Sequence, residues 1–102
     1  MQDYDYYMYT VIPDPDILTI YFQITPLTGD PDLFAARTMK EPGFKNGWEK
    51  AACFCVNLLS FSYSEIQAVP QYNTIYLSVY GLSSTTYTIN VLIERKFSEA
   101  PK

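Results

Sequence analysis

A strictly alternating stretch near the start of the chain constrains the fold more than any other feature. Over residues 17–25, Leu18, Ile20, Phe22 and Ile24 alternate with threonine, tyrosine and glutamine. Because successive side chains of a strand point to opposite faces, the pattern predicts a strand with one apolar and one polar face, as in an antiparallel sheet that is wet on one side. We expect this strand to end at Pro26. Residues 28–34 (TGDPDLF) then form a turn into a second strand, and Gly29 supplies a backbone conformation that L-residues resist.

Other short apolar runs are separated by turn residues at regular spacing. Strands are predicted over residues 3–11, 33–37, 51–61, 62–69, 74–80 and 86–94. The run 51–61 is also compatible with a short helix, but its β-branched and aromatic content favours a strand. In the last strand, Tyr87, Ile89, Val91 and Ile93 are expected to face inward. About seven short strands without a convincing amphipathic helix indicate an all-β antiparallel sandwich.

Residues 38–50 lack a regular hydrophobic period and contain Pro42, Gly43 and Gly47. They predict a long loop, which we expect Phe44 and Trp48 to pin to the body of the domain. At 102 residues the chain is expected to hold one domain, over residues 1–94, followed by a polar tail or linker over residues 95–102.

Charge and hydropathy narrow the choice of partners. The net charge is −4 and the pI is near 4.5, which disfavours nucleic acid and anionic membrane surfaces. No apolar run approaches the roughly 20 residues that span a bilayer, so membrane insertion is not expected. The first residues also lack the basic start and apolar segment of a signal peptide.

The chain contains no histidine, which removes Ser-His-Asp and Cys-His catalytic arrangements and most zinc sites. Cys53 and Cys55 therefore have no imidazole to activate them, and we expect the protein not to be an enzyme. In a strand their Cα atoms would be about 6.5–7 Å apart, at or beyond the limit for a disulfide. Free or buried thiols are favoured, and intermolecular disulfides through Cys53 and Cys55 are the alternative.

Paired aspartates flank the alternating stretch, at Asp14 and Asp16 on one side and at Asp30 and Asp32 on the other. Carboxylates in this position ordinarily cap turns, and this is the favoured interpretation. The alternative is a structural Ca²⁺ ion, for which Asp30 and Asp32 are the candidate ligands. Because the strand between the pairs is about 30 Å long, the two pairs cannot share one ion.

The chain contains ten tyrosines and one tryptophan. Tyr6, Tyr21, Tyr76 and Tyr80 are expected on outward sheet faces, where exposed aromatic rings can stack on sugars or anchor a protein interface. The candidate interaction surface consists of Tyr21, Tyr76, Tyr80 and Trp48. The competing interpretation is ordinary cross-strand packing for the tyrosines and loop anchoring for Trp48.

The order of these segments resembles the bacterial pre-peptidase C-terminal (PPC) domain family. The resemblance covers roughly residues 5–93 and depends most on 29–34 (GDPDLF), 79–81 (VYG) and 87–91 (YTINV). It implies a jelly-roll-like β-sandwich that is usually a non-catalytic part of a secreted hydrolase. It also implies that some members bind polysaccharide, protein fibres or calcium. The apolar segment 51–61, with its Cys-Phe-Cys, departs from the family pattern.

These observations predict a non-catalytic extracellular or cell-surface module for adhesion or assembly. Its expected partners are other copies of itself, neighbouring extracellular domains or polysaccharide. The alternative is a calcium-stabilised accessory domain of a secreted peptidase.

Overall fold

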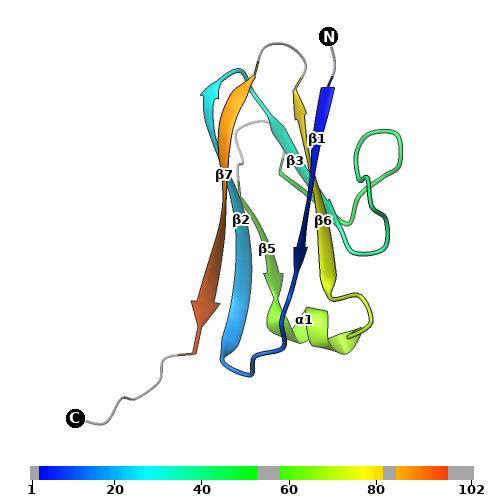
Figure 1. Ribbon diagram of the computed structural model, residues 1–102, viewed down its shortest axis with the longest axis vertical. Helices are drawn as coiled ribbons and strands as arrows, with labels where there is room; N and C mark the ends of the chain where they lie inside the picture. The colour runs from blue at the N-terminus through cyan, green and yellow to red at the C-terminus, as the bar shows by residue number, and fades with distance from the viewer. Residues whose placement is uncertain (1–2, 53–57, 82–84, 97–102) are drawn as a thin grey trace, which may run out of the picture.

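The computed structural model describes residues 3–52, 58–81 and 85–96, which form seven strands and one short helix. In chain order these are β1 (Asp3–Thr10), β2 (Ile17–Thr28), β3 (Asp32–Ala36), β4 (Lys50–Ala52), β5 (Leu58–Ser62), α1 (Tyr63–Ala68), β6 (Thr74–Gly81) and β7 (Thr86–Arg95). Figure 1 shows the long strands running along the long axis of the molecule, with α1 at one end, which we call the basal end. None of the described helices is long and apolar enough to cross a membrane.

The strands form two antiparallel sheets. One has the order β1-β6-β3-β4 and the other the order β5-β2-β7. The longest pairings join the two ends of the chain, because β1 pairs with β6 and β2 pairs with β7. The prediction of an all-β antiparallel sandwich is confirmed.

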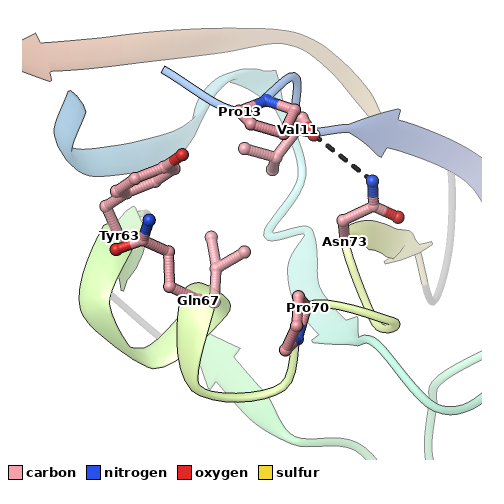
Figure 2. A pocket seen from close by; sticks show the side chains of 7 residues that line it. Val11, Pro13, Tyr63, Gln67, Pro70 and Asn73 are labelled. Carbon is pink, nitrogen blue, oxygen red and sulfur yellow. Dashed lines mark hydrogen bonds between the residues drawn. The ribbon is translucent and has the colours of Figure 1, made fainter. Parts of the chain in front are cut away.

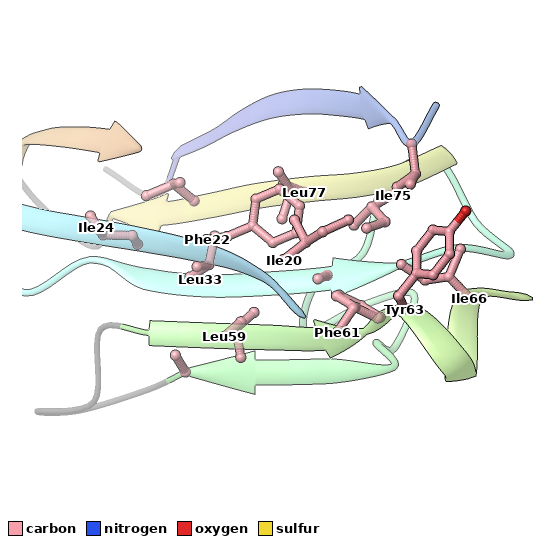
Figure 3. Packing of buried hydrophobic residues seen from close by; sticks show 14 of the residues in the cluster. Ile20, Phe22, Ile24, Leu33, Leu59, Phe61, Tyr63, Ile66, Ile75 and Leu77 are labelled. Atoms are coloured by element: carbon pink, nitrogen blue, oxygen red, sulfur yellow. The ribbon is translucent and has the colours of Figure 1, made fainter. Parts of the chain in front are cut away.

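Apolar side chains from both sheets meet in one core (Figure 3). The alternation of β2 buries Ile20, Phe22 and Ile24. The Phe22 ring lies at the centre and makes edge contacts with Tyr9 and Phe61, at centroid distances of 5.8 and 6.3 Å. Leu18, expected on the same face, is exposed, because the pairing of β2 with β7 shifts register between Ile17 and Thr19. In β7, Tyr87, Ile89 and Ile93 pack against the core. Val91 lies opposite the buried Phe22, on the predicted inner face, but it is 39% exposed in this edge strand.

The strand predicted over residues 62–69 is wrong, because this segment contains α1. Ser62 caps the helix: its side chain accepts a hydrogen bond from the Glu65 amide at 3.2 Å, and the Glu65 carboxylate accepts one from the Ser62 amide at 2.9 Å. This reciprocal capping box satisfies amides that a helix start otherwise leaves unpaired. Tyr63 and Ile66, one turn apart, are the two buried residues of the helix.

The single strand predicted over residues 51–61 is also wrong. The structure places β4 in the four-stranded sheet and β5 in the three-stranded sheet, and residues 53–57 lie outside the described part of the chain. Both strands contribute apolar side chains to the same core, so the sequence stays apolar although β4 and β5 belong to different sheets. Hydrophobicity alone therefore did not mark the boundary between them.

The predicted end of β2 at Pro26 is wrong as well, since the strand continues to Thr28. Its neighbour β5 pairs only as far as Gln23, so at Pro26 strand β2 has β7 on one side and no paired strand among the described residues on the other. A proline, which lacks an amide donor, is tolerated in such a position. Gly29 then turns the chain with a positive φ of 78°, as predicted.

Strand β7 extends one residue into the predicted tail. The Arg95 guanidinium pairs with the Asp14 carboxylate, and the Lys96 amide donates to the Asp16 carbonyl at 2.6 Å. The start of β2 and the end of β7 are thereby joined at the basal end.

Candidate functional site

The outer face of the four-stranded sheet carries a continuous group of six aromatic rings. We call this group the outer-face aromatic cluster. Its members come from three strands and from the loop between β3 and β4: Tyr4, Tyr6, Phe34, Phe44, Trp48 and Tyr80.

The strand alternation and the register place the strand members of this cluster. Tyr4 and Tyr6 are two residues apart in β1 and share the face opposite to the core-packed Tyr9. In the neighbouring strands, Tyr4 lies opposite Tyr80, and Phe34 lies opposite Ser78. Residues directly opposite each other on one face are close enough for their side chains to interact.

The rings contact one another in sequence across the sheet. Tyr6 stacks on Tyr4 at a centroid distance of 5.7 Å with an interplanar angle of 12°, and Tyr4 contacts Tyr80 at 4.9 Å. Phe44 then meets Tyr80 edge-on at 5.0 Å and Phe34 edge-on at 4.9 Å. Trp48 completes the group, 5.0 Å from Phe34. These separations and tilts are those that aromatic pairs prefer.

Hydrogen bonds hold the loop over the sheet. The buried Ser78 hydroxyl donates to the Pro42 carbonyl, and the Phe44 amide donates to the Tyr4 hydroxyl at 3.0 Å. Gly43 and Gly47 pair through two backbone hydrogen bonds of 2.8 and 2.9 Å, and Gly47 has a positive φ of 86°. The predicted pinning of this loop by Phe44 and Trp48 agrees with these contacts.

Gly43 is required at its position by a close approach. A Cβ atom there would lie 2.8 Å from Cε1 of Tyr4, closer than real Cβ contacts come. Only glycine lets the loop backbone rest on the Tyr4 ring without moving it.

An ion pair fixes the two ends of the loop. Arg37 Nη2 lies 2.6 Å from Glu49 Oε2, and the Glu49 amide donates to the Ala35 carbonyl at 2.9 Å. The hydrogen bond to Glu49 raises the pKa of Arg37, so the guanidinium stays charged. Arg37 also donates to the Glu65 carbonyl of α1 at 3.0 Å, which ties the loop to the helix.

Three rings of the cluster remain accessible although they are held in place. Tyr6 is 46% exposed, Phe44 56% and Trp48 45%, whereas Phe34 beneath them is fully buried. Beside Tyr6 lies an open hollow of about 300 Å³, lined by Tyr4, Tyr6, Glu41, Pro42, Gly43, Lys45 and Asn46. Accessible aromatic faces beside amide and charged groups can stack on a flat ligand or anchor a protein partner.

The structure brings together part of the predicted interaction surface. Trp48 and Tyr80 both contact Phe44, and Tyr76 shares the outward face of β6 with Tyr80. Tyr21 lies in the other sheet, where its hydroxyl donates to Glu94 at 3.3 Å. The sequence reasoning did not assign Tyr4, Phe34 or Phe44 to this surface. Their joining depends on the path of the loop, for which the sequence carries no periodic signal.

A second depression, mainly apolar, lies at the basal end (Figure 2). It has a volume of about 330 Å³ and is lined by Val11, Pro13, Tyr63, Ile66, Gln67, Pro70 and Asn73. Asn73 donates to the Val11 carbonyl at 3.5 Å across its rim. α1 forms one wall of this depression. Because residues 62–69 were predicted to form a strand, the sequence did not indicate the depression.

A polar contact joins the edges of the two sheets on the side of β1 and β7. The Tyr87 hydroxyl lies 2.5 Å from the Tyr7 hydroxyl and donates to the Asp5 carboxylate at 2.7 Å. Burial, together with these two hydrogen bonds, raises the pKa of Tyr87. The phenol therefore remains a neutral donor that connects β7 to β1.

The candidate calcium ligands lie in the turn between β2 and β3. Asp30 is exposed, and Asp32 is half-buried at the start of β3. No cluster of three or more Asp, Glu, His or Cys residues suited to a metal ion occurs among the described residues. Two carboxylates alone supply fewer oxygens than the roughly six to eight that Ca²⁺ takes. A calcium site at Asp30 and Asp32 stays a prediction.

The other aspartate pair lies at the opposite end of β2 and acts as a turn cap. The Asp14 carboxylate accepts from the Asp16 amide at 3.0 Å. This hydrogen bond and the one from Arg95 lower the pKa of Asp14.

Cys53 and Cys55 lie outside the described residues, and the intermolecular disulfide stays a prediction.

Comparison of the chain with protein-family models, with curated proteins and with solved structures found no match. The resemblance to the PPC domain family therefore stays a prediction.

Proposed function

We propose that this protein is a non-catalytic extracellular β-sandwich module that acts in assembly, with the outer-face aromatic cluster as its contact surface. One observation supports this most directly. Tyr6, Phe44 and Trp48 are about half exposed, yet a buried ring and loop hydrogen bonds hold the surface around them in one conformation.

Such an arrangement lowers the cost of binding. Side chains that are already ordered lose little conformational freedom when a partner covers them. Aromatic residues are also enriched among those that contribute most to interface affinity. Other copies of this chain are the partner that we favour, because the exposed apolar area of Tyr6, Phe44 and Trp48 can be covered by the same surface of a second copy across a two-fold axis.

The hollow beside Tyr6 supports a second candidate, binding to a polysaccharide. Stacked Tyr4 and Tyr6 rings form one wall, and Lys45, Asn46 and Glu41 provide polar groups at the rim. Sugar rings present apolar C–H faces and hydroxyl edges, which suit an aromatic surface with polar neighbours.

Sedimentation velocity over a range of protein concentrations tests the assembly function. We expect the weight-average mass to rise with concentration in the natural protein and in Ile12→Ser, which removes an exposed apolar side chain that is not a member of the cluster. Phe44→Ser is expected to weaken the rise, with circular dichroism confirming that it remains folded. A natural protein that stays strictly monomeric at high concentration would contradict the proposal.

Trp48 allows the two candidates to be separated, because it is the sole tryptophan. In dilute protein, polysaccharide binding would change its emission without a change in mass, whereas assembly would change emission and mass together. Emission that is insensitive both to concentration and to a panel of soluble polysaccharides would contradict both functions for this surface.

A further inference from the structure

The outer edge of β7 differs from the other strand edges of this sandwich. Four strands lie at sheet edges: β1, β4, β5 and β7. Two of them are short, with three residues in β4 and five in β5. β1 has Asp3 and Asp5 in its sequence, and Asp5 is turned towards Tyr87. Charges and shortness are the means by which natural sheets prevent unwanted edge pairing.

β7 has neither protection along most of its length. It spans ten residues, and Thr86–Ile93 contains no charged residue, proline or glycine; Glu94 and Arg95 follow at one end. Its pairing with β2 is regular from Glu94 to Tyr87, with register shifts only at the ends. Figure 1 shows β7 running beside β2 along the long axis, and no described strand pairs with its other edge.

Exposed apolar side chains lie at the middle of this edge. Val91 is 39% exposed and Leu92 49%, and they project to opposite faces of the strand. A long, regular, uncharged edge with apolar residues at its centre is a template for another strand.

We infer that the outer edge of β7 pairs antiparallel with β7 of a second copy, so that two three-stranded sheets become one six-stranded sheet. The inference rests on the proposed assembly function and names a second contact for it. A two-fold axis makes such a contact self-complementary.

The charge pattern selects a second copy in the antiparallel direction. Opposed residues of an antiparallel pair point to the same face, so a two-fold pairing is centred on one residue, here Asn90 or Val91. Glu94 then lies opposite Thr86 or Thr88 of the second copy, and no like charges meet. A parallel pairing would instead bring Glu94 close to Glu94 and Arg95 close to Arg95, which is unfavourable.

The resulting assembly has two different self-contacts. If the outer-face aromatic cluster joins one pair of copies and β7 joins the next pair, the contacts alternate, and the assembly grows open-ended wherever the two axes do not close it into a ring. A filament would then contain β7-linked dimers as its repeating unit.

Two matched substitutions test the β7 contact. Asn90 and Gln23 lie opposite each other on β7 and β2, so Asn90→Lys and Gln23→Lys add the same charge to the same face of neighbouring strands. Only Asn90→Lys places lysines close together across the proposed axis. Both changes make the net charge of the protein less negative, so a loss of association cannot come from increased overall repulsion.

Sedimentation velocity is used with Phe44→Ser as the background, which isolates the β7 contact from the aromatic one. We expect Phe44→Ser to form dimers. Adding Gln23→Lys to this variant should keep the dissociation constant of the dimer within about twofold. Adding Asn90→Lys should raise the dissociation constant about tenfold or more, because like charges are brought together. Hydrogen exchange should show β7 amides becoming more protected as concentration rises, except with Asn90→Lys.

The possible outcomes separate the two proposals. If the natural protein assembles but Asn90→Lys behaves like Gln23→Lys, the β7 inference is overturned and the assembly function stands. If Asn90→Lys alone reduces dimerisation while Phe44→Ser has no effect on the natural assembly, β7 pairing is supported and the aromatic contact is not. A natural protein that is monomeric throughout overturns both.

Discussion

The Tyr87 hydroxyl connects the two sheets at the edge formed by β1 and β7. It is shared with Tyr7 and Asp5, both in β1, whereas the ring of Tyr87 packs against the core from β7. Removing it leaves the Asp5 carboxylate and the Tyr7 hydroxyl without this partner.

Tyr87→Phe is therefore expected to lower the free energy of unfolding by about 0.5–1.5 kcal/mol, the usual net contribution of an intramolecular hydrogen bond. Urea denaturation at neutral pH measures the change. Tyr72→Phe, which removes an exposed phenolic hydroxyl in the turn after α1, is the control and should change the stability by less than about 0.5 kcal/mol. Equal effects of the two substitutions would show that the contact between β1 and β7 adds no stability.

Gly43 gives a second prediction at the scale of a single residue. In Gly43→Ala the new methyl group meets the Tyr4 ring at 2.8 Å, so the ring must shift, which disturbs its contact with Tyr80 and its hydrogen bond with the Phe44 amide. We expect a loss of about 1–2 kcal/mol, typical of local overpacking, and a changed Trp48 emission in the folded state. Lys45→Ala, an exposed change in the same loop, should leave both unchanged, and an unshifted emission in Gly43→Ala would mean that the loop is not fixed by this contact.

At the scale of elements, α1 is held by groups from both sheets. Glu65 accepts from Lys50 of β4 at 2.7 Å and from the Ser62 amide at the end of β5, and its own carbonyl accepts from Arg37. Burial alone would raise the pKa of Glu65. The hydrogen bonds from Lys50 and Ser62 outweigh burial and hold the pKa below its usual 4.5.

This lowered pKa predicts a dependence of stability on acid. The contribution of Glu65 is present above about pH 4.5 and is lost as the pH falls through the lower pKa of the folded state. Glu65→Gln should cost about 1 kcal/mol at neutral pH, because solvent screens a pair this exposed, and the difference from the natural protein should shrink on acidification. Melting temperatures from pH 7 to about pH 2 measure this. A difference in melting temperature between Glu65→Gln and the natural protein that does not depend on pH would indicate that only the shape of the side chain matters. Gln67→Ala, on the exposed side of α1, serves as the control.

The elements that the sequence predicted well are those with a complete local signal. β2 alternates in sequence from Leu18 to Ile24, β6 alternates over its whole length, and Gly29 marks the turn after β2. α1 was missed although Ser62 and Glu65 have the spacing of a capping box, because a six-residue helix contains too few apolar positions to show a helical period.

The candidate site was only partly predictable, for a related reason. The positions of Tyr80 and Tyr76 follow from strand alternation, and Trp48 could be recognised as a loop anchor. The joining of Tyr4 to Phe44 depends on which strands are neighbours and on how the loop folds back. Those relations involve residues far apart in the chain and leave no periodic pattern in the sequence.

At the scale of the whole molecule, charge opposes assembly. Copies that each carry a net charge of −4 repel one another at neutral pH. Salt screens this repulsion, since the Debye length falls from about 10 Å at 0.1 M to about 3 Å at 1 M ionic strength.

We therefore expect the weight-average mass at a fixed protein concentration to rise with ionic strength and to rise as the pH approaches the pI near 4.5. Light scattering in a salt series at pH 7 and in a pH series measures both effects. Gln23→Lys, which is one unit less negative, should depend less steeply on salt. A mass that falls as salt is added would indicate that attraction between opposite charges, rather than apolar contact and strand pairing, holds the copies together.

The pairing of β1 with β6 and of β2 with β7 has a consequence for the order in which the molecule is made. A ribosome releases the first two strands early, but their long partners lie in the last third of the chain. Until those partners emerge, Ile20, Phe22 and Ile24 have no completed core to enter. Non-local pairing of this kind folds slowly. The protein should therefore depend on the speed of synthesis and on holding chaperones more than its small size suggests, and slowing translation before β6 would prolong the period in which the nascent chain can aggregate.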